Sequence, residues 1–320
     1  MTVASRSSRH LPSVVHLVRH KAPLESLERF LDSYRRHDAG VDHQLVLLCK
    51  GFPSDREVQP VLERLDGLRV ERIDVADDGY DLTAYRRAAE RIDGDVACYL
   101  NSNSALLCDG WLALLLSALT PQVGIAGATG SWNSAHSNAL YLLRVPGAYR
   151  SVFPDRAWHR VQSRRLHADG STGSAAGMMA RPPLRYLHAA YAVGGALALF
   201  RPFPAIHIRT NGFVIRNETL RRLRFRSLPN KLRAWQLESG RGCITEQIRA
   251  GGLEAVIVGR NGCTYRPHEW PDSDTLCQAD QGNLIVADNQ TERYRLADAE
   301  LRMLLSMLTW GGAARPSPPT

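Results

Sequence analysis

The sequence predicts an α/β protein with a largely parallel sheet flanked by helices. In the first part of the chain, short apolar runs alternate with stretches whose apolar residues recur at helical spacing, as in successive βα units. Polar residues gather directly after several of these runs, where strands end and α/β proteins bind ligands. With 320 residues, of which 44% are hydrophobic and 22% charged, the chain has ample core for one large or two medium domains.

The expected elements of the first half follow from local patterns. Residues 13–19 form an apolar run, which predicts the first strand. Residues 24–36 place Leu24, Leu27, Phe30, Leu31 and Tyr34 at helical spacing, which predicts the first helix. The alternation continues with strands at 43–49, 68–75 and 96–100, helices at 57–65, 82–92 and 111–119, and a strand at 123–128.

The second half is less regular. Residues 131–138 are expected to form a loop, and residues 139–200 to form helices broken by a polar turn at 167–173. Order returns with one strand at 205–215, kinked at Gly212. The remaining expected elements are a helix at 240–250 that Gly251 and Gly252 end, a strand at 254–259, a polar loop or cap at 281–294 and a last helix at 295–308.

Composition limits the classes of function and the compartment. The longest apolar run, residues 188–200, is shorter than the roughly 20 residues that cross a bilayer. There is no export-signal pattern, and the six cysteines form no C-x-x-C pair, so a cytoplasmic protein with reduced thiols is expected. The cysteines are Cys49, Cys98, Cys108, Cys243, Cys263 and Cys277.

The positive charge is concentrated in the middle of the chain. The formal charge is +8, but residues 141–240 alone hold 17 Lys and Arg against four acidic residues, a local excess of +13. Such a segment can attract diphosphates, anionic lipid head groups or nucleic acid. Nucleic acid is not expected, because no nucleic-acid-binding motif is present and aromatic residues make up only 7% of the chain. Peripheral attachment at the inner face of an anionic membrane stays a hypothesis.

Polar motifs at the strand ends resemble the glycosyltransferases of the GT-A fold, family 2-like. The segment from Cys98 to Ser104 reads Cys-Tyr-Leu-Asn-Ser-Asn-Ser, and the resemblance places Asn101 and Asn103 at the family's acidic motif. Asn211-Gly212-Phe213 matches its acceptor-side strand, Glu238-Ser239 its acidic residue before a helix, and His268 its later His, over about residues 13–270. Residues 79–85 are also similar to rhamnan-type polysaccharide glycosyltransferases.

The resemblance implies a domain organisation. It implies a GT-A-like nucleotide-binding sheet with flanking helices and a helical insertion. The expected parts are a flexible N-terminus at 1–12, a nucleotide-sugar-binding half at 13–138, the insertion at 139–204, an acceptor-side half at 205–312 and a disordered tail at 313–320.

The resemblance also implies an activity and its residues. The expected reaction is hexosyl transfer from a nucleotide-sugar donor to a hydroxyl of a saccharide, lipid-linked or small-molecule acceptor, in polysaccharide biosynthesis of the cell envelope. Glu238 is the candidate general base, with Arg241 pairing with the diphosphate or with Glu238. Mg²⁺ or Mn²⁺ would be held by Asn103 and His268. The candidate donor contacts are Arg19, His20, Asp77, Asp78, Asp81, Tyr85, Arg86, Asn101, Ser102, Asn103, Asn211 and Gly212.

Two positions depart from the family pattern. Lys50-Gly51-Phe52 follows the second strand, where the family carries an acid for the nucleotide base. Asn101 and Asn103 offer neutral amide oxygens, which are weaker ligands for hard cations than carboxylates. Arg and Lys side chains are therefore the alternative counter-charge for the diphosphate.

Blander alternatives stay open at several of these residues. Asn101 and Asn103 suit an Asx turn, the Asp and Gly cluster at 77–81 an ordinary turn, Tyr85 the core and Glu238 an acid at a helix N-terminus. A non-catalytic GT-A-like binding protein is the alternative function. A Rossmann-type cofactor enzyme and a Ser-His-Asp hydrolase are disfavoured, because the chain lacks G-x-G-x-x-G after the first strand and G-x-S-x-G anywhere. The oligomeric state stays open.

Overall fold

The computed structural model describes residues 11–144, 193–225 and 231–314. Most of the expected N-terminus (1–12) and tail (313–320) lie outside these residues, as do residues 145–192 of the expected insertion. None of the described helices is long and apolar enough to span a membrane.

An eight-stranded mixed sheet forms the centre of the fold, in the order β11-β10-β6-β9-β4-β1-β2-β3. Strand β1 pairs in parallel with β2 and β4, β2 with β3, and β6 with β10, whereas β9 is antiparallel to both β4 and β6. The predicted α/β class is confirmed. The strands are β1 (Ser13–Arg19), β2 (Gln44–Lys50), β3 (Val70–Val75), β4 (Val96–Leu100), β6 (Val123–Gly127), β9 (Gly212–Arg216), β10 (Glu254–Val258) and β11 (Thr264–Tyr265).

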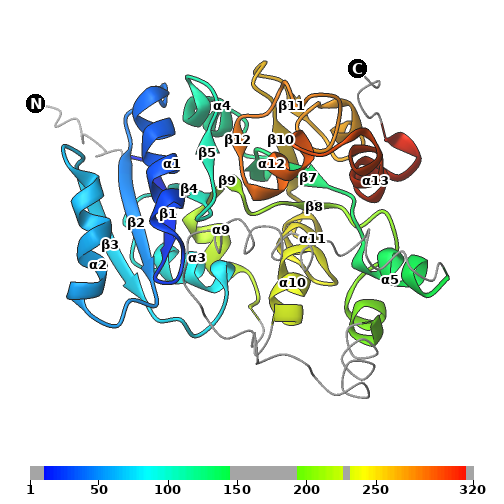
Figure 1. Cartoon of the computed structure of the whole chain (residues 1–320), viewed down its shortest axis with the longest axis horizontal. Helices are drawn as coiled ribbons and strands as arrows, with labels where there is room; N and C mark the ends of the chain where they lie inside the picture. Colours follow the sequence, from blue (N-terminus) through cyan, green and yellow to red (C-terminus); the bar gives the residue numbers. More distant parts are fainter. Residues whose placement is uncertain (1–10, 145–192, 226–230, 315–320) are drawn as a thin grey trace, which may run out of the picture.

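Helices flank the sheet, which buries apolar side chains on both faces. In β1, Val14 and Val18 belong to one core cluster and Val15 and Leu17 to the other, as the alternation of side chains along a strand requires. Figure 1 shows the N-terminal βα units at one end of the molecule and α13 at the other, with α12 between them. The helices are α1 (Leu24–Arg36), α2 (Asp55–Leu62), α3 (Asp81–Ala89), α4 (Trp111–Ser117), α5 (Ala135–Arg144), α9 (Asn217–Arg222), α10 (Lys231–Ser239), α11 (Ile244–Ala250), α12 (Asn289–Arg295) and α13 (Ala299–Trp310).

The single strand expected at 205–215 is wrong, because residues 209–211 interrupt it. Strand β8 (His207–Ile208) pairs with β7 (Gly130–Ser131) in a separate two-stranded sheet, and β9 then enters the main sheet. The loop expected at 131–138 is also wrong, since it holds the end of β7 and the start of α5. Residues 209–211 therefore form a bent segment at the edge of the main sheet.

The C-terminal part is more ordered than its polarity suggests. The loop expected at 281–294 contains β12 (Val286–Ala287), which pairs with β5 (Ala105–Leu106), and the start of α12. The helix expected at 295–308 is present as α13, which begins at Ala299 because Asp298 caps it. Asp288 caps the separate helix α12 before it. Four polar side chains of this segment are hydrogen-bonded inside the fold, namely Gln281, Asn283, Asp288 and Thr291.

Candidate active site

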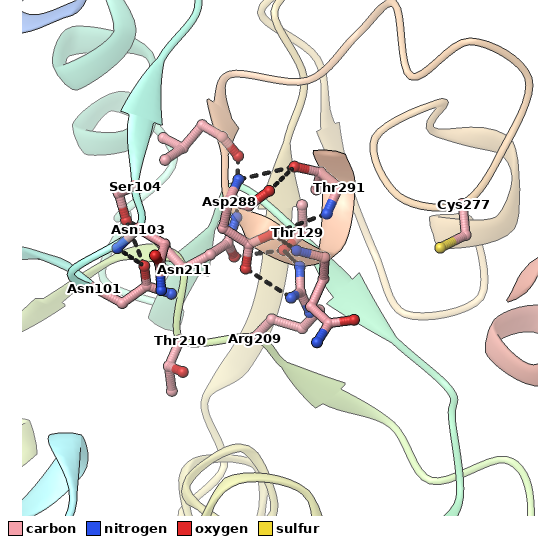
Figure 2. A network of polar contacts seen from close by, with 12 residues as sticks. Asn101, Asn103, Ser104, Thr129, Arg209, Thr210, Asn211, Cys277, Asp288 and Thr291 are labelled. Atoms are coloured by element: carbon pink, nitrogen blue, oxygen red, sulfur yellow. Dashed lines mark hydrogen bonds and ion pairs between the residues drawn. The ribbon is translucent and has the colours of Figure 1, made fainter. Parts of the chain in front are cut away.

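The carboxyl ends of the parallel strands and the start of β9 lie at one edge of the sheet, because β9 runs in the opposite direction. Three segments therefore meet there: the turn after β4, residues 209–211 before β9, and Thr129 after β6. Figure 2 shows their side chains in one polar network, with Cys277 apart from it. Ligands of open α/β sheets bind at such an edge.

The turn after β4 is an Asx turn. The Asn101 Oδ1 atom accepts a hydrogen bond from the Asn103 backbone N–H at 2.8 Å, and Ser104 Oγ lies 3.2 Å from the same oxygen. Ser104 Oγ also donates to the carbonyl of Asn211, and the Arg29 guanidinium donates to the carbonyl of Asn103. The turn is thus fixed from α1 on one side and from the segment before β9 on the other.

Asn211 and Gly212 have packing roles at this edge. The Asn211 amide donates to the Val286 carbonyl at 3.0 Å and accepts from Thr129 Oγ1 at 2.6 Å, so both ends of this buried amide are occupied. At Gly212, an added Cβ would lie 3.1 Å from the Val286 side chain. Both residues join the main sheet to β12.

Arg209 and Asp288 form a largely buried ion pair at the centre of the network. The Arg209 Nη2 atom lies 2.8 Å from Asp288 Oδ2, and Nη1 donates to Thr129 Oγ1 at 3.3 Å. The side chains are 14% and 2% exposed, respectively. The other Asp288 oxygen accepts the backbone N–H groups of Gln290 and Thr291, which caps α12. The sequence interpretation missed Asp288; its one signal was Asp288-x-x-Thr291, which here forms a capping box.

Glu238 lies beside this pair. Its Oε1 atom accepts a hydrogen bond from Thr210 Oγ1 at 2.9 Å. Burial raises the pKa of Glu238 above its ordinary value, and the hydrogen bond from Thr210 and the charge of Arg209 oppose this rise. Asp81 raises the same pKa further. A carboxylate with a raised pKa binds a proton more readily than a carboxylate with the ordinary pKa.

Glu238 and Arg241 lie on either side of the end of α10. Glu238 is in the last turn of α10, so its interpretation as an acid at a helix N-terminus is wrong. Arg241 is exposed and makes no ion pair with Glu238 in the described structure. Its backbone is fixed instead, with the N–H donating to the Leu199 carbonyl at 2.8 Å.

The three Asp residues after β3 differ in their surroundings. The buried Lys50 side chain donates to the Gly79 carbonyl at 2.6 Å and lies 3.3 Å from Asp77 Oδ1, which ties this loop to β2. Asp78 pairs with Arg87, and this hydrogen-bonded contact lowers the pKa of Asp78. Asp81 opens α3 and is half-buried.

Tyr85 and Arg86 make contacts within the protein. Tyr85 has no exposed surface and packs on Tyr99 with 5.0 Å between ring centroids, as expected of a core residue. Burial raises the pKa of Tyr85 well above its ordinary value. Arg86 lies over the Phe225 ring at 5.0 Å and pairs with Glu90 at 3.4 Å. The donor contacts expected of both residues stay predictions.

A cavity of about 160 Å³ opens at the ends of β1 and β2, between α1 and α2. Its lining includes Arg19, His20 and Ser102 from the predicted donor set, together with Phe52 and Glu57. Ser102 belongs to the turn after β4, so the cavity adjoins the polar network. His20 contacts both Phe52 and Glu57. Its Nε2 atom lies 3.5 Å from Glu57 Oε2, and its ring meets the Phe52 ring edge-on.

His16 belongs to the same cavity lining and was also missed by the sequence interpretation. Its ring is fully buried and stacks on Phe30 with 3.7 Å between centroids. Neither ring nitrogen has a hydrogen-bond partner among the described residues. Burial lowers the pKa of His16 to about 3, so the ring is neutral at physiological pH. The cavity therefore combines apolar walls with the neutral His16 ring and the charged side chains of Arg19 and Glu57.

The donor atoms at this edge do not match the needs of Mg²⁺ or Mn²⁺. These cations favour charged oxygens, whereas the Asn101 oxygen is neutral and already hydrogen-bonded within the turn. The Asp288 carboxylate is occupied by Arg209 and by the start of α12. His268 is exposed in the loop after β11. Among residues 11–144, 193–225 and 231–314, no cluster of three His, Cys, Asp or Glu could hold a metal ion.

Comparison with known proteins gives similarity to solved structures only. No protein-family model and no curated protein sequence matches the chain. The chain is similar to a mannosyltransferase from Pyrobaculum calidifontis, solved with GDP-Man and Mn²⁺, at 11% identity and a TM-score of 0.41, over 78% of this chain and 55% of that one. It is similar to glucosyl-3-phosphoglycerate synthase from Mycobacterium tuberculosis, solved with Mn²⁺, UDP and phosphoglyceric acid, at 15% identity and a TM-score of 0.37, over 78% and 68%.

A third similar structure is the galactosyltransferase LgtC, solved with donor and acceptor sugar analogues, at 13% identity and a TM-score of 0.35, over 66% of this chain and 59% of that one. The chain thus matches little more than half the length of the mannosyltransferase and of LgtC. At these identities and TM-scores the similarity carries no conclusion about activity.

Proposed function

We propose that the protein is a glycosyltransferase that uses a nucleotide-sugar donor. The observation that carries this proposal is the order of features along the sheet edge. The cavity lies at β1 and β2, the Asn101–Asn103 turn at β4, Arg209 before β9, and Glu238 beside Arg209. A nucleotide-sugar has the same order of parts: base, diphosphate, sugar.

The cavity is the proposed site of the nucleotide base. Its apolar walls, which include Phe52, suit a flat heterocycle, and a neutral His16 can both donate and accept a hydrogen bond. Arg19, His20 and Ser102 from the predicted donor set lie in the same lining. The diphosphate would then extend from the cavity over the turn after β4.

Glu238 is the proposed general base. The acceptor hydroxyl forms a bond to the anomeric carbon while the bond from that carbon to the diphosphate oxygen breaks. The hydroxyl proton passes to Glu238, and the electron pair of the broken bond leaves with the diphosphate. The raised pKa of Glu238 supports this role, because a base with a very low pKa binds a proton poorly. Hexosyl transfer to a saccharide, lipid-linked or small-molecule hydroxyl is the acceptor class proposed from the sequence.

Glu238→Gln tests the role of Glu238. A panel of nucleotide-sugars is first screened by thermal shift, because a ligand that binds the native state raises its apparent stability. Transfer from the stabilising donor is then measured. Gln keeps an oxygen for Thr210 but cannot take a proton, so kcat should fall by about 10²- to 10⁴-fold with donor affinity nearly unchanged. Glu218→Gln is the matched control, since Glu218 is exposed on α9 and pairs with Arg222. Unchanged turnover in Glu238→Gln would remove Glu238 from the mechanism.

The second candidate is a non-catalytic GT-A-like protein that binds nucleotides or saccharides. The neutral turn at Asn101 and Asn103 favours it, since the turn lacks acidic metal ligands. A donor that stabilises the wild-type protein without any transfer or hydrolysis would support this candidate. Transfer that depends on Glu238 would exclude it.

A further inference from the structure

Arg209 is connected to the turn after β4 by a continuous chain of hydrogen bonds. Its Nη1 atom donates to Thr129 Oγ1, and Thr129 donates to Asn211 Oδ1. The Asn211 carbonyl accepts from Ser104 Oγ, which lies 3.2 Å from Asn101 Oδ1. In Figure 2, Asn211 lies between the Asn101 and Asn103 side chains and Arg209, which is next to Thr129 and Asp288. The guanidinium therefore belongs to the same edge as the turn and is fixed relative to it.

The guanidinium of Arg209 has donors to spare. One of its terminal nitrogens contacts Asp288 and the other Thr129, and a guanidinium carries five N–H groups in a rigid fork. The side chain keeps 14% of its surface exposed, so it is not completely sealed from solvent. The Asp288 charge is shared with two backbone N–H groups of α12, so it is not directed at Arg209 alone.

A leaving diphosphate needs positive charge or strong donors, because negative charge develops on its oxygen as the sugar departs. The turn at Asn101 and Asn103 supplies no net negative charge to hold a dication there. Arg209 is a positive charge already in place and held in one orientation by two partners.

We propose that Arg209 donates hydrogen bonds to the leaving diphosphate and replaces a divalent cation as its counter-charge, with Asp288 and Thr129 as positioning residues. This inference rests on the proposed function, since it assumes a nucleoside diphosphate as the leaving group. As the bond between the anomeric carbon and the diphosphate oxygen breaks, that oxygen keeps the electron pair. The N–H groups of Arg209 then face an oxygen whose charge has increased.

Binding of inorganic pyrophosphate in excess EDTA tests the inference without any sugar transfer. Isothermal titration calorimetry should show that the wild-type protein binds pyrophosphate in EDTA. Mn²⁺ added in excess of the EDTA should change this affinity by no more than about threefold, which is well under a tenfold change in Kd. Arg209→Met should weaken binding by about 10- to 100-fold, as loss of a charge-assisted hydrogen bond predicts. Arg209→Lys keeps the charge without the fork and should lie between the two.

Arg222→Met is the matched control for charge. It removes the same charge from an exposed side chain that pairs with Glu218 on α9, and it should bind pyrophosphate like the wild-type protein. Equal binding by Arg209→Met and Arg222→Met would overturn the inference, as would wild-type binding that disappears in EDTA and returns with Mn²⁺. If Arg209→Met fails to fold, Arg209→Lys decides: pyrophosphate binding by Arg209→Lys in EDTA with the wild-type affinity would overturn the role of the guanidinium fork.

Transfer kinetics separate this inference from the proposed function. At a pH where Glu238 is ionised, Arg209→Met should lower kcat while the acceptor KM stays within about twofold, because the lost contact acts on the leaving group. Pyrophosphate binding that depends on Arg209 in a protein without transferase activity would refute the proposed function alone. Transfer that proceeds with Arg209→Met at the wild-type rate in EDTA would refute the inference alone.

Discussion

Asp288 has two roles that substitutions can separate. Its Oδ1 atom caps α12 through Gln290 and Thr291, and its Oδ2 atom pairs with Arg209. Asp288→Asn keeps the cap, because Asn caps helices as well as Asp does, but removes the charge. Asp288→Ala removes both. The difference between the two variants therefore measures the cap, and Asp288→Asn measures the ion pair.

The structure sets the size of each effect. Asp288 is 2% exposed and Arg209 14%, so breaking the pair from one side strands a charge in a largely buried site. We expect Asp288→Asn to lower the free energy of unfolding by about 3 kcal/mol, the low end for such a pair because Arg209 keeps some contact with solvent. Asp288→Ala should lower it by about 1 kcal/mol more through the lost cap.

A double-mutant cycle checks the reasoning. Urea unfolding of the wild-type protein, Asp288→Asn, Arg209→Met and the double variant gives the coupling free energy, provided that the denaturant slope stays constant. The double variant leaves no stranded charge, so it should be more stable than the sum of the single effects predicts, with a coupling of about 2 kcal/mol or more. Additive single effects would show that the pair does not hold Arg209 in place.

Two further predictions concern Thr210 and Gly130. Thr210→Val removes the hydrogen bond that lowers the pKa of Glu238, so the acidic limb of the kcat/KM profile should move to higher pH, because the base is ionised only above its pKa. Thr210→Ser keeps a hydroxyl and should leave the limb in place. If the limb does not move in Thr210→Val, the profile does not report the ionisation of Glu238. Gly130→Ala would place a Cβ 2.5 Å from the buried Trp270 ring and should lower the free energy of unfolding, measured in urea, by about 1–3 kcal/mol. Gly312→Ala is the control, because Gly312 has open space around it, and it should change this free energy little. Equal urea midpoints for the two variants would contradict the tight packing at Gly130.

The regular part of the fold was predictable because its signals are local. Apolar runs and helical spacing correctly place β1 to β4 and α1 to α4 within a few residues, and these elements bring Asn101 and His20 to one edge of the sheet. The order of motifs also pointed to a GT-A fold. These predictions need only neighbouring residues and the rule that parallel strands end at a common edge.

The parts that failed depend on distant residues. The break at 209–211 is made by pairing of β8 with β7, some 80 residues away, and the sequence around Arg209 gives no sign of that partner. Asp288 looked like part of a polar loop, because its partners Arg209 and the backbone of α12 are visible only once the chain has folded. Tyr85 on α3 is likewise buried by Tyr99 and Phe213, which belong to the strands β4 and β9.

Lys50 adjoins the cavity that His16 lines. Lys50 and Arg19 are paired neighbours at the ends of β2 and β1, and Arg19 belongs to the cavity lining. Lys50 uses its charge on Asp77 and Gly79 and fixes the loop before α3. In the proposed function, a base that binds here meets the apolar wall at Phe52 together with the charged side chains of Arg19 and Glu57. Its recognition would therefore combine a close fit to apolar side chains with a few polar contacts that fix its orientation.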